Sequence, residues 1–479
     1  MQKRKLMSRP ALTMMIVVTL ILTASLVASG AATTKQLSTN FTLVNLSTSS
    51  NLVNIQYYKG DGTQWRPSES ATLTSQGSQL IRRQYDDTQL TSGSGSVVVG
   101  GQGPMGAVVQ IQARGQTPTS GAYSGSAVGS NSANVPLIAK GGSSASGAVN
   151  SQIIIQNTGT TATSIQVEFV NSNGTTVYTS PSTNIAAGAS YTYDLTNDTS
   201  APNGFFSAVV KAATGGQVTV VSNLFTGSNG MQTFSGFSSS AQKWLVPLFT
   251  SRLGNGLSTP VTVQNLSGGS IPAGAIKLQC KADPSSGGSD FNKSNPAAVT
   301  NTASAIFNPV TDNTIPANWY GACTIDTTGY NTVAFVQMRF VGTDRAASYE
   351  AIRADGTKTK VIVPLYMKRL TNGFATAVTI QNLGASSANV NIAYQAGDGA
   401  PAGCSVNVGP FTIAAGGSLI QNHRITSGAN SVPTLPENCF GSMVVTSTNS
   451  QPVEAFVQID DLDQGTGDPF MAHNAFTAD

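Results

Sequence analysis

An acidic run near the end of the chain is the densest group of side chains that could do chemistry. The stretch "DDLDQGTGD" contains Asp461, Asp463 and Asp468, with Asp460 ahead of them and two glycines between them. Carboxylate oxygens at this spacing suit Ca²⁺, and glycines permit a tight loop around an ion. The stretch lacks the closing Glu of an EF-hand loop. Two interpretations stay open: a calcium site in the last part of the chain, or the solvated tip of a hairpin. Calcium is the only cofactor that the sequence suggests.

A second group of residues could bind a sugar. The stretch "YYKGDGTQW" places Tyr58 directly after Tyr57, and Trp65 across a glycine-containing turn. Neighbouring side chains of a strand point to opposite faces, so Tyr58 points outward if Tyr57 points inward. Outward aromatic faces at Tyr58 and Trp65 would form a ligand site. The alternative is a small packing cluster at one end of the core.

Enzymatic chemistry lacks its usual groups in this sequence. There are only two histidines, His423 and His473, and no HExxH, GxSxG or phosphate-binding glycine loop. A pair of carboxylates could still hydrolyse a glycoside without histidine. We interpret His473 as a packing residue and His423 as a loop residue. The sequence therefore predicts a protein without catalytic residues, and not an enzyme.

The N-terminus has the pattern of a secretory signal. Lys3, Arg4, Lys5 and Arg9 precede the apolar stretch "ALTMMIVVTLILTASLVA", and small residues near Ala31 permit cleavage. An uncleaved membrane anchor is the alternative, since about 18 apolar residues can just span a bilayer. We predict a signal peptide over residues 1–31 and an extracellular or cell-surface location. Membrane contact is expected only through this segment, if it stays.

Charge and length restrict the partners and the domain count. A chain of 479 residues exceeds what one core usually serves. Without the four basic residues of the signal, 21 Lys and Arg remain against 22 Asp and Glu. Nearly neutral chains without a basic stripe bind nucleic acid poorly, so no nucleic-acid partner is expected.

After the signal, the chain repeats one unit. Each copy has a strand ending in Asn, then a strand with one apolar face, and later two apolar runs around a polar turn. The strand-ending residues are Asn45, Asn157, Asn265 and Asn382. Three copies open with Val-Pro-Leu, at Val135, Val246 and Val363, and the first lacks this opener. We predict repeat 1 over 32–131, repeat 2 over 132–242, repeat 3 over 243–359 and repeat 4 over 360–479.

The pattern inside each copy predicts an all-β fold. Apolar residues alternate with polar ones in the second strand, which is typical of a half-buried strand. Asp-Gly and Asn-Gly pairs follow, as tight hairpins require, and no long helical pattern occurs. The predicted inward residues include Ile55, Val167, Leu278 and Ile392. We expect four tandem antiparallel sandwiches with separate interiors.

The four cysteines fit this arrangement. An even count in an exported chain suggests disulfides. Cys280 and Cys323 both fall at inward positions of repeat 3, where a bridge would staple the core. Cys404 and Cys439 lie elsewhere in repeat 4, near strand ends. None has the close spacing of a zinc site.

The stretches "VPLFTSRLGNG", "VPLYMKRLTNG", "VTVQNL", "VTIQNL" and "GSMVVTSTNSQPVEAFVQ" resemble repeats of uncharacterised exported bacterial cell-surface proteins. Those proteins are built of tandem immunoglobulin-like β-sandwich modules. The likeness covers nearly all of the chain after the signal and is best in repeats 3 and 4. It implies the fold and the location, and it carries over no catalytic residues.

Three functions follow as hypotheses. The first is a non-enzymatic structural or adhesive protein whose partners are itself, other surface proteins or surface glycans. The second is a secreted module that binds carbohydrate or another ligand, assisted by calcium. The third, an enzyme with dispersed carboxylates, has the least support. Short linkers such as "GSNSANVPL" predict that neighbouring repeats touch and form a semi-rigid rod.

Overall fold

The strands form antiparallel sheets that come in consecutive pairs along the chain. The computed structural model describes residues 16–22, 37–90, 93–113, 117–463 and 465–479. Eight sheets are present in these residues, two for each predicted repeat, and only β1 (Ile16–Leu22) comes from outside the four ranges. The predicted all-β, antiparallel sandwich class is confirmed. The exact borders between repeats stay predictions.

Repeats 1 and 2 each contain an outer and an inner sheet. In repeat 1 the outer order is β1-β6-β3-β4 and the inner order is β5-β2-β7-β8. In repeat 2 the outer sheet is β13-β12-β16-β9 with β14 on β12, and the inner sheet is β10-β11-β17-β18 with β15 on β11. The strands are β2 (Leu37–Asn45), β3 (Asn51–Lys59), β4 (Gln64–Leu73), β5 (Gln79–Arg83), β6 (Gly95–Gly101), β7 (Met105–Ala113), β8 (Ser120–Ser124), β9 (Ser132–Lys140), β10 (Gly142–Ser144), β11 (Gly147–Asn157), β12 (Thr163–Val170), β13 (Thr176–Thr179), β14 (Thr183–Ile185), β15 (Ser190–Asp194), β16 (Gly204–Ala212), β17 (Val218–Thr226) and β18 (Gly230–Ser235).

Repeats 3 and 4 follow the same plan. Their outer sheets are β23-β22-β25-β19-β28 and β32-β31-β34-β29-β37, and their inner sheets are β20-β26-β21-β24, with β27 on β26, and β33-β30-β35-β36. The strands are β19 (Lys243–Ser251), β20 (Leu257–Ser258), β21 (Val261–Asn265), β22 (Lys277–Ala282), β23 (Phe291–Ser294), β24 (Ser304–Phe307), β25 (Trp319–Asp326), β26 (Thr332–Phe340), β27 (Ala346–Glu350), β28 (Ile352–Arg353), β29 (Lys360–Met367), β30 (Phe374–Asn382), β31 (Ala388–Ala396), β32 (Asn407–Ile413), β33 (Ser418–Asn422), β34 (Phe440–Ser447), β35 (Val453–Asp461), β36 (Met471–Asn474) and β37 (Phe476–Ala478). Short 3-10 helices lie at Gln84–Asp86, Leu195–Asn197, Pro284–Ser286 and Ala354–Gly356.

The apolar stripe of the second strand faces the interior in every repeat. Ile55, Val167, Leu278 and Ile392 are all buried, on β3, β12, β22 and β31. These are equivalent strands of the four outer sheets. The alternation read from the sequence is therefore confirmed, because only one face of each outer sheet packs on its inner sheet.

The repeated asparagine holds the corner of each sandwich. Asn265 donates its Nδ2 hydrogens to the carbonyls of Gly269, at 2.7 Å, and Val299, at 2.8 Å, and its Oδ1 accepts from the Ser267 amide at 2.9 Å. Asn45, Asn157 and Asn382 make the same bonds to residues four and two positions later and to the facing loop. All four asparagines are fully buried. The corner explains why the sequence repeats an Asn at the end of a strand.

Replacing Asn265 by alanine is expected to lower the free energy of unfolding by about 3 kcal/mol, because the buried carbonyls and the Ser267 amide lose their partners. Denaturant titration followed by tryptophan fluorescence measures the change. Asn292→Ala is the matched control, since Asn292 lies on the exposed face of β23, and it is expected to change stability by less than about 0.5 kcal/mol. Equal effects of the two substitutions would contradict the role of the corner.

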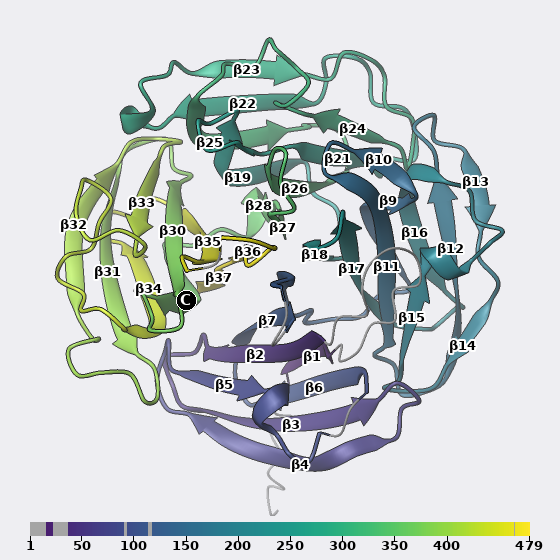
Figure 1. Cartoon of the computed structure of the whole chain (residues 1–479), viewed down its shortest axis with the longest axis horizontal. Coiled ribbons are helices and arrows are strands. Elements are labelled where there is room, and N and C mark those ends of the chain that lie inside the picture. Colours follow the sequence, from purple (N-terminus) through teal and green to yellow (C-terminus); the bar gives the residue numbers. More distant parts are fainter. Residues whose placement is uncertain (1–15, 23–36, 91–92, 114–116, 464) are drawn as a thin grey trace, which may run out of the picture.

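The four repeats form a closed ring. Figure 1 shows the sandwiches around a common axis, with the outer sheets at the periphery and β18, β27 and β36 pointing to the middle. Repeat 4 contacts repeat 1: β29 lies against β2, and Lys360 donates to Gln76 at 3.1 Å. The prediction of a rod is wrong, although the predicted contact between neighbours is present. Successive contacts curve the chain around this axis, so the fourth repeat meets the first.

The interiors are also not separate. One buried hydrophobic cluster runs through repeats 2 and 3 and includes Phe456 of repeat 4, while Ala122 of repeat 1 joins the cluster of repeat 4. The expectation of isolated interiors is therefore corrected: apolar residues at the seams join one core to the next.

The predicted signal lies mostly outside the described residues, including its basic start and the cleavage position near Ala31. The described portion, β1, pairs with β6 of repeat 1. Among the residues that the structure describes, no helix has the length and apolar character needed to cross a bilayer.

Candidate functional site: the seams and the axis of the ring

One serine position joins three of the four repeats to the repeat that follows it. Ser96, Ser207 and Ser442 occupy equivalent places at the start of β6, β16 and β34. Ser96 donates to the Gly188 carbonyl at 3.0 Å, Ser207 donates to the Thr302 carbonyl at 2.7 Å, and Ser442 donates to the Gly77 carbonyl. The three acceptors lie at one position of the same turn, in repeats 2, 3 and 1, and all have positive φ.

The recurrence of this bond defines the symmetry of the ring. The donor of one repeat meets the turn of the following repeat, so the interface is head-to-tail. Head-to-tail contacts form a closed ring only when the rotation between neighbours divides a full circle. Repeat 4 makes to repeat 1 the contact that repeat 1 makes to repeat 2. The ring is thus a pseudo-four-fold assembly within a single chain.

The seam between repeats 3 and 4 lacks the bond. Ala322 occupies the serine position, and the facing turn of repeat 4 contains Gly416 with φ +70°. Ala322→Ser is expected to stabilise the protein by about 0.5–1 kcal/mol through a new bond to the Gly416 carbonyl. Thermal unfolding measures the gain. The reverse change, Ser207→Ala, is expected to cost about 1 kcal/mol, and a neutral result there would contradict the role of these serines.

At the axis, the closing strands β8, β18, β27 and β36 meet and hydrogen-bond to each other. Ser235 donates its hydroxyl to the Ser124 carbonyl at 2.7 Å, and its amide donates to the Glu350 carboxylate. Asn474 donates to the Glu350 carbonyl at 2.7 Å. These residues occupy one equivalent position of the four closing motifs, which the sequence shows as "YS", "FS", "YE" and "HN". The chain of bonds runs through repeats 1, 2, 3 and 4 in order.

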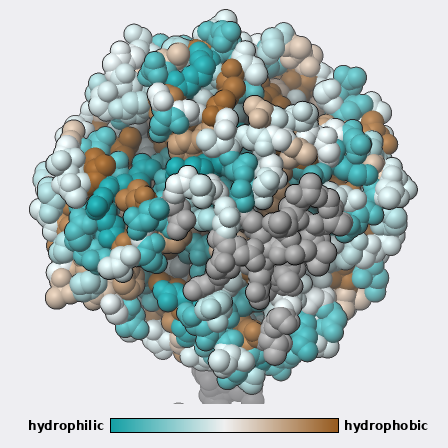
Figure 2. Space-filling view, viewed as in Figure 1, coloured by the Kyte–Doolittle hydropathy of each residue, from teal (hydrophilic) through white to brown (hydrophobic). Residues whose placement is uncertain are grey.

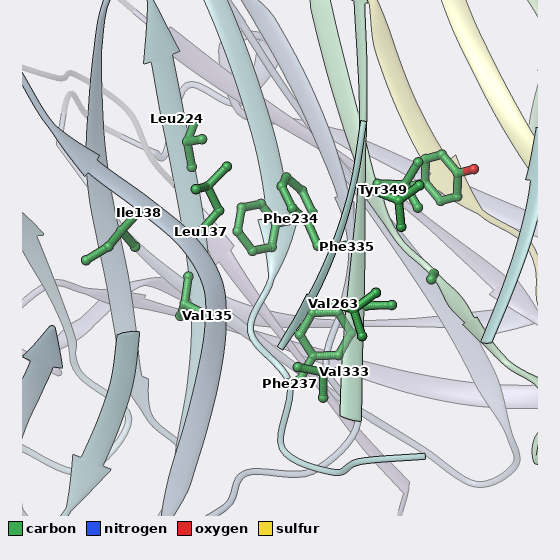
Figure 3. Packing of buried hydrophobic residues seen from close by; sticks show 14 of the residues in the cluster. Val135, Leu137, Ile138, Leu224, Phe234, Phe237, Val263, Val333, Phe335 and Tyr349 are labelled. Atoms are coloured by element: carbon green, nitrogen blue, oxygen red, sulfur yellow. The ribbon is translucent and has the colours of Figure 1, made fainter. Parts of the chain in front are cut away.

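Aromatic rings pack beside this chain of bonds. Phe234 of β18 faces Phe335 of β26, with ring centroids 4.0 Å apart, as Figure 3 shows. Tyr349 of β27 makes the equivalent contact with Phe456 of β35, at 4.1 Å. The first ring of each pair belongs to a closing motif, and the second belongs to the late hairpin of the next repeat. Near the axis the seams therefore combine ring packing with hydrogen bonds between the closing strands.

Asp468 connects all four repeats. Its carboxylate accepts from the amides of Met231 in repeat 2, at 2.8 Å, and Ala346 in repeat 3, at 3.0 Å. Its own amide donates to the Pro118 carbonyl of repeat 1 at 2.8 Å, and Ser120 donates to its carbonyl at 2.8 Å. The side chain is fully buried. Both carboxylate oxygens are used: Oδ2 accepts from the Met231 amide, and Oδ1 accepts from the amides of Ala346 and Phe470.

Burial controls the ionisation of the carboxyl groups near the axis and the seams. Burial raises the pKa of Asp468 well above its ordinary value, and the three backbone N–H donors oppose that rise. Burial likewise raises the pKa of Glu350, against the Ser235 amide, and raises the pKa of Glu454 to about 8. All three carboxyl groups accept hydrogen bonds from backbone amides inside the protein.

The structure separates the three predicted calcium ligands. Asp461 and Asp463 both direct carboxylate oxygens at Gly373, and the Asp463 amide donates to Asp461 Oδ1 at 3.0 Å. Asp468 instead lies at the axis with its oxygens on backbone amides. Among the described residues, no group of three or more His, Cys, Asp or Glu side chains is arranged to hold a metal. Calcium binding by Asp461 and Asp463 stays a prediction.

The two predicted ligand-binding aromatics lie in packing contacts. Trp65 exposes only 8% of its surface and covers Gly95 within the core of repeat 1. Tyr58 lies beside Gly188 in the turn of repeat 2, at the same seam as Ser96. The expectation for Trp65 is corrected, because Trp65 fills the end of the sandwich. Tyr58 is half-buried and points away from the core, opposite to the buried Tyr57, as expected, and its ring lies at a seam. The sequence does contain a signal for this role. Tyr58 follows the inward Tyr57, and Gln395 holds the equivalent position in repeat 4, where it lies beside Gly77 at the next seam.

Both disulfides are present in the structure. Cys280 and Cys323 face each other on β22 and β25, with Cα atoms 4.1 Å apart, inside the core of repeat 3. Cys404 and Cys439 join a loop to the residue before β34, with Cα atoms 5.3 Å apart. The described residues contain no free cysteine.

The two histidines are buried rather than accessible. His473 lies at the axis, and burial lowers its pKa to about 4. His423 is not the loop residue that the sequence suggested: its ring nitrogens lie 2.8 Å from Thr376 Oγ1 and 2.8 Å from Tyr394 Oη, inside repeat 4. Burial and the nearby Lys368 charge lower the pKa of His423 to about 3. Sequence spacing gave no sign of this cluster.

The seam between repeats 4 and 1 is hollowed. Two hollows, of about 570 Å³ and 310 Å³, lie there, and Phe440 lines both. Arg82 lines the larger one and is paired with Glu69 at 2.9 Å. Both amide atoms of Gln79 are buried there, and no residue in the described ranges offers them a hydrogen bond. Arginine and aspartate side chains make up much of the lining of the larger hollow, among them Arg83 and Asp86, which line both hollows.

Comparison with known proteins gives no family. No protein-family model and no curated protein matches the chain. The crystal structure of Thermotoga maritima 1070 is similar with 14% identity and a TM-score of 0.19, over 23% of this chain and 94% of that chain. A tetra-tandem repeat in the extending region of a large adhesion protein is similar with 13% identity and a TM-score of 0.10, over 96% and 99%. Both TM-scores are too low to support an inference about function.

Proposed function

We propose that this protein is a non-enzymatic structural or adhesive protein of the bacterial cell surface, which presents a rigid ring of sandwiches to its partners. The closed ring, with one seam repeated around it and Asp468 joined to every repeat, is the observation that supports this proposal. The disulfides fit an oxidising location. Both histidines are buried in packing, which fits a protein that acts through contact and not turnover.

The periphery of the ring offers the contact surfaces. On the face seen in Figure 2, most of the surface is hydrophilic or neutral, and hydrophobic residues lie in small scattered groups. The outer sheets end in edge strands, which can pair with strands of another molecule. Pro67 in β4, Lys293 in β23 and Pro410 in β32 hinder such pairing at three edges. In repeat 2, β13 carries neither proline nor charge, and Val177 on it is 43% exposed.

Repeat 2 is therefore the proposed point of contact, with a second copy of the ring as the simplest partner. The purified protein is expected to self-associate in sedimentation and in electron micrographs, and to bind to bacterial surfaces. Val177→Lys is expected to weaken association at least tenfold. Leu52→Lys is the matched control, because Leu52 is equally exposed but lies on the central strand β3. A ring that stays monomeric and binds no surface would refute the proposal.

Ligand binding is the second candidate, supported by the hollows between repeats 4 and 1. A glycan array tests this function, with Arg83→Leu expected to weaken binding at least tenfold because Arg83 lines both hollows. Gln166→Leu is the control, since Gln166 is an exposed polar residue on the outer sheet of repeat 2 and lines neither hollow. The proposed calcium site is tested separately: a rise in melting temperature with Ca²⁺ that Asp461→Asn removes would support it, and no rise would exclude it.

A further inference from the structure

The Val-Pro-Leu openers fill one strand position in repeats 2, 3 and 4. Each opener strand pairs with the first strand of the late hairpin: β9 with β16, β19 with β25, and β29 with β34. The register is the same each time, and the facing pairs are Val135 and Ala208, Val246 and Cys323, and Val363 and Met443.

The opener strands also reach the next repeat. β9 contacts β21 of repeat 3, β19 contacts β30 of repeat 4, and β29 contacts β2 of repeat 1. The opener position therefore belongs both to one sandwich and to one seam. An empty position would leave an unpaired strand edge beside the seam.

In repeat 1, β1 occupies this position. Ile16–Leu22 pairs antiparallel with β6 along the whole strand, and Leu20 is the register partner of Val97. Val97 is the equivalent of Ala208, Cys323 and Met443, so the register matches that of the openers. The sequence "IVVTLIL" is rich in β-branched residues, which suit a strand.

Of the described residues ahead of β2, the segment Ile16–Leu22 takes this place. Cleavage near Ala31 would leave only residues 32–36 before β2, which begins at Leu37. In repeat 4 the opener strand begins at Lys360, well ahead of Phe374 at the start of β30. A chain without the N-terminal segment therefore has an open edge at β6.

We propose that the edge of β6 in repeat 1 is a strand-acceptor site and that its occupant is the chain's own segment Ile16–Leu22. The segment that the sequence marks as an export signal thus has a second role. It completes the outer sheet of repeat 1, as the openers complete the outer sheets of the other repeats. Main-chain hydrogen bonds in a fixed register provide the recognition.

A pair of engineered cysteines tests the register in the full chain. Thr19 and Val98 are register partners, and Val98 is only half-buried, so Thr19→Cys with Val98→Cys is expected to form a disulfide under mild oxidation. Peptide mapping by mass spectrometry without reduction detects it. Thr19→Cys with Val209→Cys is the control, because Val209 occupies the equivalent place in repeat 2 and faces Asn134 of β9. The proposal would be overturned if the first pair of introduced cysteines formed no disulfide, or if both pairs formed one equally.

Hydrogen exchange tests the acceptor edge itself. In a chain that begins at residue 32, the β6 amides on the side of β1 are expected to exchange at least about 100-fold faster than in the full chain, while the β6 amides on the side of β3 and the β16 amides stay protected. A synthetic peptide of residues 14–24 is expected to restore protection in β6, and a scrambled peptide is not. Equal protection of β6 in the two chains, or no effect of the peptide, would overturn the proposal.

Discussion

Asp468→Ala is expected to lower the free energy of unfolding by about 4 kcal/mol or more, the largest loss expected from a single substitution in the ring. The change removes the acceptor for the buried amides of Met231, Ala346 and Phe470. Each buried donor left without a partner costs about 1–3 kcal/mol. Two of these amides belong to other repeats, so the loss acts on the assembly of the ring and not on repeat 4 alone.

Denaturant titration and hydrogen exchange at β18 and β27 measure this effect. Asp468→Asn retains one acceptor oxygen of the same size and is expected to cost about half as much. Asp463→Ala is the matched control, because Asp463 is a nearby carboxylate away from the axis, and it is expected to change stability by less than about 0.5 kcal/mol. If Asp468→Ala weakened only repeat 4, or cost no more than the control, Asp468 would not be the residue that joins the repeats.

Glu454→Gln is expected to stabilise the protein at neutral pH by about 3 kcal/mol, because a tenfold change in proton affinity corresponds to about 1.4 kcal/mol. Glu454 is buried on β35, and no ion pair of the described residues includes it. Burial raises its pKa from 4.5 to about 8. Between these values the folded protein holds a proton that the unfolded chain has released. The stability from this group is therefore complete below pH 4.5, falls as the pH rises to about 8, and then stays constant.

Glutamine has the same shape and does not titrate, so the difference in stability between the two proteins should follow that window. Unfolding free energies measured on both sides of the window and within it give the difference. The expected gain is near zero in acid, below the ordinary pKa of a glutamate, and largest above the raised pKa of Glu454. Glu437→Gln is the control, since Glu437 is exposed in an ion pair with Arg369. A gain that does not change with pH would show that Glu454 is ionised in the folded protein.

Local patterns in the sequence were sufficient for the features that depend on one strand and its own turn. The alternation that buries Ile55 and its equivalents, the strand-ending asparagines and the inward position of Cys280 and Cys323 all follow from this kind of pattern. Each reflects a choice between two faces of one sheet. Period-two alternation records that choice directly, because a half-buried strand must place its apolar residues on one side.

The candidate site is only partly visible in the sequence. The acidic run marks Asp468 as a carboxylate of interest, but its contacts with three other repeats depend on residues more than 100 positions away. Tyr58 and Trp65 stand out as aromatics, while their burial depends on a neighbouring turn and on Gly95. The cluster around His423 also brings together residues from separate strands. Pair contacts of this kind leave no periodic signal in a single sequence.

The sequence by itself determined the all-β class, the repeated unit, the faces of its strands and the positions of the cysteines, because these depend on local alternation and on turn residues. Only the tertiary structure decided that four units close into a ring, that Asp468 lies where they meet, and that β1 fills the opener position of repeat 1. The angle between neighbouring sandwiches is set by how their surfaces fit. A small difference in that angle, which no local pattern encodes, separates a rod from a closed ring.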